Sequence, residues 1–153
     1  METLERVLAE HPFLLDLPSR YLGLLVGCAS QVRWNPGDFA FRLGEPANTF
    51  YLIRHGHVAL EFYTSERGPI TIQTVGEGEA LGWSWLVPPY VWHLDGRIIS
   101  TTLAFSFDAA CLRGKCEEDH DLGYELYKSF APIIAQRLQA TRLQVLDVHR
   151  VHA

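Results

Sequence analysis

The chain has 153 residues, of which 48% are hydrophobic and 20% charged, and its net charge is −5 with histidine neutral. That length suits one domain with one core, and the composition excludes a disordered or collagen-like chain. An acidic chain has no general attraction to phosphate backbones, so DNA is a poor candidate partner, and the apolar runs end before the ~18 residues that a membrane span needs.

Residues 1–30 are expected to form two or three short helices. Apolar side chains recur here at helical spacing, and Pro12 and Pro18 interrupt the pattern. The first ten residues lack the basic and apolar regions of a signal peptide. The sequence therefore begins with a helical segment that we expect to remain part of the folded domain.

The chain has three cysteines, Cys28, Cys111 and Cys116, and none of them forms a metal-like CxxC pair. In a chain without an export signal, such an odd set is expected to consist of reduced thiols. The cysteines therefore favour a cytoplasmic location.

Residues 31–107 alternate between short runs rich in β-branched and aromatic residues and clusters of turn residues. The runs are 31–34, 39–41, 49–54, 58–63, 70–75 and 98–107. Their regular spacing favours an antiparallel barrel or sandwich, and a jelly roll fits both the number of runs and the length. Gly56 lies between the third and fourth runs, where we expect a hairpin turn with positive φ.

Residues 108–153 are expected to be helical. Asp108 would cap a short helix that ends at Gly114, and a longer helix would follow, kinked at Pro132. Its apolar stripe is broad enough to favour a homodimer through the C-terminal helix, the alternative being that the stripe packs wholly on its own barrel. The stripe consists of Leu126, Phe130, Ile133, Ile134, Leu138, Thr141 and Val145.

The order of these signals resembles the cyclic-nucleotide-binding domain of the catabolite-activator (Crp/Fnr-like) superfamily over nearly the whole chain. The segments that carry the resemblance are 11–14 with 17–18, 37–38 with 44–47, 50–58, and 75–82. It implies a mainly β fold with flanking helices: N-terminal helices over 1–30, an antiparallel β-roll over 31–107 and a long C-terminal helix within 108–153. It also implies a non-catalytic regulatory or sensor domain. Because the chain stops at Ala153, we expect a single stand-alone domain without a helix-turn-helix module.

The family's phosphate-binding cassette has a Gly-Glu pair at the start of a short helix, where backbone N–H groups receive the phosphate. Two registers of this pair are possible. If Gly78 and Glu79 form it, the glutamate that holds the ribose is retained. The second register, which we adopt, makes Gly82 the cassette glycine and keeps Gly76 and Gly78 on family glycines. It places Trp83 where the glutamate should be.

In this register the family's phosphate-binding arginine falls at His93 or Leu94, and the nearest arginine, Arg97, comes a few residues late. Each lost charged contact costs about 1.5–3 kcal/mol in a desolvated site. We therefore expect that cyclic AMP and cyclic GMP are not bound in the usual way. Three of the four tryptophans also lie within residues 83–93.

Two interpretations of this aromatic segment remain open. In one, the pocket is retuned for a flat or apolar ligand, with tryptophans as walls and a few polar anchors. In the other, the tryptophans fill the pocket. The candidate ligand-binding residues are Gly82, Trp83, Ser84, Trp85, His93 and Arg97. We expect no cofactor and no metal, but an unknown small-molecule effector that moves the C-terminal helix, a movement read by a partner protein.

Two alternatives are an ordinary cyclic-nucleotide receptor and a cupin-like, metal-dependent enzyme. His55 and His57, with Glu61 behind them, resemble part of a cupin motif, because alternate residues of a strand share one face. Gly56 is better explained by a turn, which leaves two exposed turn histidines. No phosphate loop or Ser-His-Asp arrangement is recognisable, so we expect no enzyme.

Overall fold

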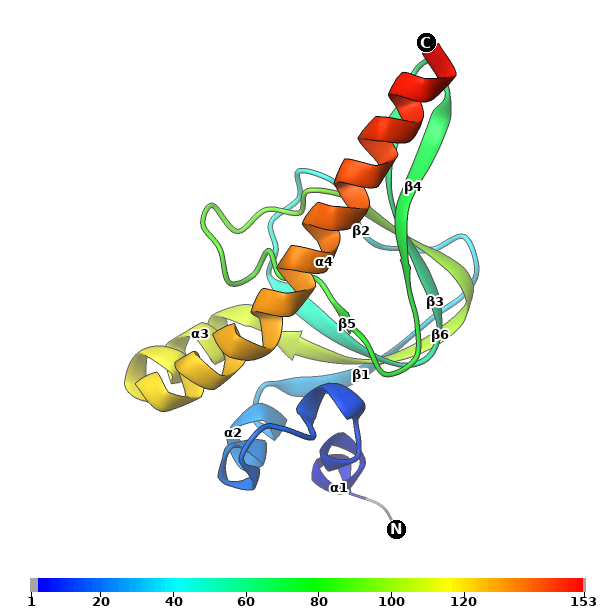
Figure 1. The fold of residues 1–153 in the computed structure, drawn as a ribbon. Coiled ribbons are helices and arrows are strands. Elements are labelled where there is room, and N and C mark those ends of the chain that lie inside the picture. Colours follow the sequence, from blue (N-terminus) through cyan, green and yellow to red (C-terminus); the bar gives the residue numbers. More distant parts are fainter. Residues whose placement is uncertain (1–2, 153) are drawn as a thin grey trace.

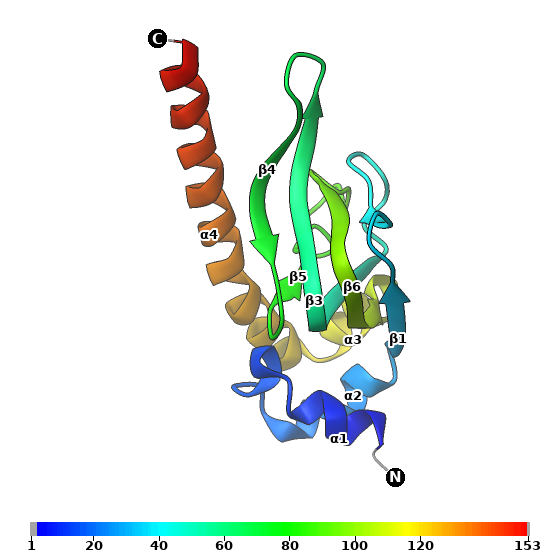
Figure 2. The ribbon, with the colours of Figure 1, turned by 90° about the vertical axis from the view of Figure 1, so that its right-hand side faces the viewer.

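The computed structural model of the chain describes residues 3–152, with side chains described through residue 147. Its helices are α1 (Leu4–Ala9), α2 (Leu22–Val26), α3 (Ala109–Glu118) and α4 (His120–His152), with 3-10 turns η1 (Pro12–Leu14) and η2 (Ser19–Tyr21). Its strands are β1 (Ala29–Trp34), β2 (Phe39–Phe41), β3 (Thr49–Thr64), β4 (Gly68–Val75), β5 (Ala80–Leu81) and β6 (Asp95–Asp108). The N-terminal helices lie at one end of the sheet, and α4 runs along it beside β4 (Figures 1 and 2).

The strands of the described residues form one antiparallel sheet with the order β1-β6-β3-β4, in which β2 pairs with β6 and β5 with β3. The long strands β3 and β6 are its centre and pair from Thr49 opposite Asp108 to Glu61 opposite Asp95, with shifts of register between Ile53 and Val58. The sheet is rolled but not closed, which confirms the predicted β-roll with flanking helices. Among the helices described, none is both long enough and apolar enough to cross a lipid bilayer.

The prediction of a hairpin turn at Gly56 is wrong. Gly56 lies inside β3, at a point where the register between β3 and β6 shifts, and the turn to β4 comes at residues 65–67. Its φ is +104°, and a Cβ there would collide with Thr102 on β6. The glycine is therefore required by a bulge within one long strand, which adds to the twist of the roll.

Asp108 caps α3 as predicted, because its Oδ1 accepts a hydrogen bond of 2.8 Å from the Cys111 N–H. The predicted end of this helix at Gly114 is wrong, since α3 continues to Glu118. Asp119 then begins α4 by accepting hydrogen bonds from the N–H groups of Asp121 and Leu122. The helix passes through Pro132 without ending.

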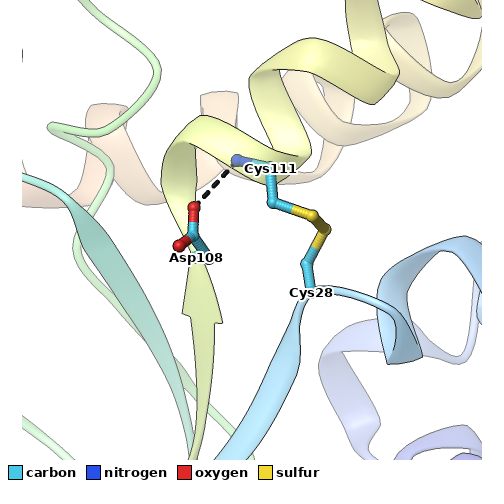
Figure 3. The surroundings of a disulfide bond; sticks show 3 residues. All are labelled: Cys28, Asp108 and Cys111. Carbon is cyan, nitrogen blue, oxygen red and sulfur yellow. Dashed lines mark hydrogen bonds between the residues drawn. A yellow bond between two sulfur atoms is a disulfide. The ribbon is translucent and has the colours of Figure 1, made fainter.

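Cys28 and Cys111 form a disulfide that joins the segment before β1 to the first turn of α3 (Figure 3). Their Cα atoms are 5.8 Å apart although 83 residues separate them in sequence. The expectation of three reduced thiols is thus wrong for two of them, and the cysteines no longer argue for a reducing compartment. Cys116 remains a free, half-buried thiol whose pKa is raised by burial.

Four aromatic rings, three of them stacked and one edge-on, form the centre of the hydrophobic core where α4 meets the sheet. Phe50 of β3 lies between Trp85 and Phe107, with ring centroids 4.5 and 4.6 Å away, and Phe130 of α4 meets its edge at 5.3 Å. Such contacts add to the burial energy of the rings. This aromatic core, consisting of Phe50, Trp85, Phe107 and Phe130, holds the first half of α4 on the sheet.

Candidate functional site

The chain leaves β5 through a tight turn at the candidate cassette. Gly82 has φ +96°, and the Leu86 N–H donates to the Trp83 carbonyl at 3.0 Å. A hydrogen-bonded turn therefore stands where the resemblance implies a short helix. A single turn does not align enough peptide dipoles to give the anion preference of a helix start.

Backbone hydrogen bonds fix the next part of this segment to the loop before β3. The Gly44 N–H donates to the Trp92 carbonyl at 2.8 Å, and the Trp92 N–H donates to the Glu45 carbonyl at 2.9 Å. A third bond of 2.7 Å joins the Ala47 N–H to the Tyr90 carbonyl. Because these bonds hold the backbone, the side chains around Trp92 form a pre-ordered wall.

Gly82 is required by the close approach of an indole ring. Trp92 stacks on Phe41 with ring centroids 3.7 Å apart and planes 6° from parallel, and a Cβ on Gly82 would collide with the six-membered ring of Trp92. The Trp92 ring therefore occupies the space beside Gly82 in which a side chain would lie.

A cavity of about 380 Å³ lies between this segment and α4, and we call it the helix-side cavity. Its walls come from β2, β3, the segment after β5 and one face of α4. The lining residues are Phe41, Leu60, Gly82, Trp83, Ser84, Trp92, His93, Leu94, Ile134, Arg137, Leu138 and Thr141. The volume lies in the range of small-molecule sites, and most of the walls are apolar, as is usual for such sites.

Four of the six candidate residues line this cavity. Trp83 stacks on His93 with ring centroids 5.5 Å apart, which gives one flat wall. Ser84 is buried, and its hydroxyl has no hydrogen-bond partner among the described residues. Gly82 supplies the turn between these walls. The structure thus brings Gly82, Trp83, Ser84 and His93 together.

Trp85 and Arg97, the other two candidates, lie elsewhere. Trp85 is 0% exposed within the aromatic core. Arg97 binds Glu61 through two nitrogens, at 2.7 and 3.3 Å, and this pairing raises the pKa of Arg97. A guanidinium that is already bound to a carboxylate in this forked way is not available to a ligand.

The alternative register does not bring its two charged residues together. The Glu79 carboxylate accepts a hydrogen bond of 3.4 Å from the Gly76 N–H. Glu79 lines a smaller neighbouring cavity of about 170 Å³ on the other side of Arg137, whereas Arg97 remains with Glu61. Glu79 and Arg97 therefore do not face a common ligand site.

Sequence analysis missed Arg137, the charged group of the helix-side cavity. Arg137 is 9% exposed, and its Nε donates to the Gln73 side chain on β4 at 2.9 Å. Burial lowers its pKa to about 10. The signal was present in the sequence, because Arg137 follows Ile133 and precedes Thr141 at intervals of four, which puts all three on one helical face.

The two histidines of the cupin-like motif each have a different partner. The imidazole of His55 lies 3.5 Å from the Glu77 carboxylate, and that of His57 lies 3.2 Å from the Ser100 hydroxyl. Both are in β3 rather than in a turn. Among the described residues, His, Cys, Asp and Glu side chains form no group of three that could hold a metal ion.

Comparison with known proteins gives one family and many structural neighbours. The sequence profile of the family described as "Cyclic nucleotide-binding domain" matches residues 31–119. No curated protein matches the sequence significantly.

Solved structures agree in fold. A candidate cyclic nucleotide-binding protein from Geobacter metallireducens GS-15 superposes with a TM-score of 0.78 at 23% identity, covering 90% of this chain and 99% of its own. The sensor domain of the transcriptional regulator DNR from Pseudomonas aeruginosa superposes with a TM-score of 0.70 at 20% identity, covering 88% of this chain and 93% of its own. The N-terminal domain of a transcriptional regulator from Streptomyces coelicolor A3(2) superposes with a TM-score of 0.67 at 21% identity, covering 91% of this chain and 94% of its own.

Proposed function

The chain belongs to the cyclic nucleotide-binding domain family, and from that premise we propose that it is a non-catalytic sensor whose helix-side cavity binds a small molecule. The proposal adds that cyclic AMP and cyclic GMP are not bound in the family's usual way. The observation that carries it is the apolar cavity of about 380 Å³ between the altered cassette and α4.

Three features support a changed specificity. In the adopted register Trp83 stands at the position of the ribose-binding glutamate, and it lines the cavity. The Trp92 ring packs against Gly82 on the side where a Cβ would project, at the glycine where the adopted register places the phosphate. Arg97 is held by Glu61, so the charge expected for the phosphate is already paired. A cyclic nucleotide placed here would lose the family's contacts to the cassette glutamate and to the arginine that follows it, each worth about 1.5–3 kcal/mol.

The position of α4 supports a regulatory role. Phe130 anchors the first half of this helix in the aromatic core, and the following turns line the cavity with Ile134, Leu138 and Thr141. A ligand in the cavity would contact the helix directly and change how its second half packs. The ligand can change the free-energy difference between two positions of the helix only by the difference between its binding free energies for those positions. A partner protein would read that shift.

The second half of α4 supports a homodimer. The exposed apolar side chains Leu138 and Val145 are seven residues apart on one face of the helix, and Leu143 and Leu146 are also exposed. The first half of the predicted stripe, at Leu126 and Phe130, is buried in the chain's own core. The remaining exposed face fits a second copy of α4, since a self-complementary apolar stripe favours twofold pairing.

The ligand proposal is tested with protein purified from its own host. Native mass spectrometry is expected to find a small molecule bound at one per chain. Titration with cyclic AMP and cyclic GMP, followed by tryptophan fluorescence, is expected to give no saturation at micromolar concentration. Micromolar binding of cyclic AMP that is lost in Arg97→Gln would contradict the proposal and mark an ordinary cyclic-nucleotide receptor.

The dimer proposal is tested by sedimentation equilibrium of Val145→Glu. A carboxylate placed in an apolar pairing face should separate the chains, because it would be buried without a partner. Leu15→Glu is the matched control, since Leu15 is also exposed but lies near the N-terminal helices. A wild-type protein that sediments as a monomer, or a Val145→Glu variant that remains dimeric, would contradict this part.

A further inference from the structure

Arg137 is the only arginine described in the structure that is buried without a carboxylate partner. Its Nε is satisfied by Gln73, but within the described residues no side chain or carbonyl accepts a hydrogen bond from its two terminal nitrogens. The guanidinium lines the helix-side cavity on one side and the smaller cavity of Glu79 on the other, with Glu79 beyond salt-bridge distance. It therefore keeps most of its hydrogen-bonding capacity unused.

The two terminal nitrogens of Arg137 are open to the cavity rather than sealed in the core, because Trp85 Nε1 is the only fully buried side-chain nitrogen or oxygen among the described residues that lacks a partner. Glu79 acts on the guanidinium only at longer range. A guanidinium remains charged at neutral pH, and burying a charge without a counter-charge is strongly unfavourable. Burial lowers the pKa of Arg137 to about 10, which still leaves it protonated at neutral pH. Two forked N–H pairs in a cavity match the geometry of a carboxylate or phosphate, and the bonds that they form to anions are the strong ones.

We infer that Arg137 is the anion receptor of the helix-side cavity and that the ligand is a small planar aromatic monoanion. The anionic group lies on the guanidinium of Arg137, and the ring lies against Trp83. This inference rests on the proposed function, because it names the class of ligand for the same cavity. In this arrangement the charged contact to the ligand comes from α4 instead of the cassette, and α4 is the element whose position would change on binding.

The rest of the lining supports each part of that description. Arg137 is the only arginine, lysine, aspartate or glutamate among the lining residues, so the described wall offers one fixed positive charge, which matches a ligand with one negative charge. The stacked Trp83 and His93 offer a flat face for offset stacking. The Ser84 hydroxyl can make a neutral polar contact, and the Thr141 hydroxyl, which donates to the Arg137 carbonyl, can still accept one, which suits a ring with few substituents.

Isothermal titration of the full chain with 2-naphthoate and its neutral isostere 2-naphthamide tests the inference. Naphthoate is expected to bind the wild type more tightly than naphthamide. Arg137→Gln should weaken naphthoate about tenfold to a hundredfold and leave naphthamide unchanged, because it removes the charge but keeps a side chain that can reach Gln73. Arg142→Gln is the matched control, an exposed arginine of the same helix that lies outside the cavity; it should change neither affinity.

A stability measurement separates anion binding from a structural role. Without ligand, Arg137→Gln should melt at or above the wild-type temperature, because the variant no longer buries an uncompensated charge. A large fall in the melting temperature would show that Arg137 is structural and would overturn the inference. Equal naphthoate affinity in wild type and Arg137→Gln, or no naphthoate binding to the wild type at about 1 mM, would also overturn it.

The same titrations distinguish a failure of the Arg137 inference from a failure of the proposed sensor function. If naphthoate and naphthamide bind equally and both are weakened by Trp83→Ala, the cavity binds ligands but Arg137 does not select an anion. If cyclic AMP also binds and Arg137→Gln weakens it, Arg137 is an anion receptor but the anion is a cyclic phosphate. That result overturns the small planar ligand class and the proposal that cyclic AMP is not bound. If neither naphthyl compound binds and native mass spectrometry finds no ligand, both proposals fail.

Discussion

Trp83 and Trp85 are two residues apart in one segment, yet they belong to two different regions of the molecule. Trp85 is fully buried in the aromatic core between Phe50 and Phe130, whereas Trp83 is half-buried and faces the helix-side cavity beside His93. One region is closed packing and the other is a cavity. A run of tryptophans therefore does not by itself distinguish a filled pocket from an open one.

Two arginines outside the aromatic core, Arg97 on β6 and Arg137 on α4, show a similar contrast. Arg97 has a buried carboxylate partner, and Arg137 has only an amide. A paired charge stabilises the fold, whereas an unpaired buried charge costs stability unless something binds to it. A buried charged side chain that has no partner of opposite charge therefore marks a candidate ligand site.

Truncating Trp85 should have the largest effect on the free energy of unfolding and should separate the aromatic core from the cavity. Trp85→Ala removes a fully buried ring and should lower the free energy of unfolding by about 3–5 kcal/mol, measured by urea denaturation. Trp83→Ala is the matched change at the cavity and should cost about 1 kcal/mol or less, because its ring is half-exposed. Equal losses in the two variants would show that the cavity wall is part of the core.

Removing the disulfide should have the next largest effect, confined to stability. The double variant Cys28→Ser, Cys111→Ser opens a crosslink across 83 residues and should lower the free energy of unfolding by about 2–4 kcal/mol. The crosslink lies at the aromatic-core end of the sheet, so ligand affinity in the cavity should not change. An intact protein that loses no stability on treatment with a thiol reductant would contradict the prediction.

Breaking the Arg97–Glu61 pair should cost less. Arg97→Gln leaves the carboxylate of Glu61, which is 5% exposed, without its cation. Because the Arg97 side chain is itself 39% exposed and water can replace part of the contact, the expected loss is about 1–2 kcal/mol. Ligand binding should remain as in the wild type, and a large loss of affinity in calorimetry would place Arg97 in the site after all.

The smallest expected effect is a pH dependence from His11. Its Nε2 lies 2.8 Å from the Ile53 carbonyl, and burial lowers its pKa from 6.5. The unfolded chain therefore binds this proton more readily than the folded chain. Stability from this group is fully present above pH 6.5 and decreases as the pH falls toward the folded-state pKa. In His11→Gln, denaturation curves between pH 5 and 7.5 should lose this part of the dependence.

The β-roll and its helices could be read from the sequence because they depend on local patterns. The strand runs, the Asp108 cap and the interruptions at Pro12 and Pro18 are set by residues close together in the chain. Gly56 was misplaced because a bulge and a hairpin turn both require positive φ. Only the partner strand, through Thr102, shows which of the two it is.

The sequence by itself determined the fold family, the approximate positions of most helices and strands, and four of the residues that line the helix-side cavity. Tertiary structure alone decided the disulfide, the burial of Trp85 and the partner of Arg97, because each depends on groups distant in the chain. It also decided that Arg137 is the unpaired charge. Helical periodicity places a side chain on a face, but whether that face meets a carboxylate, an amide or an open cavity depends on the rest of the fold.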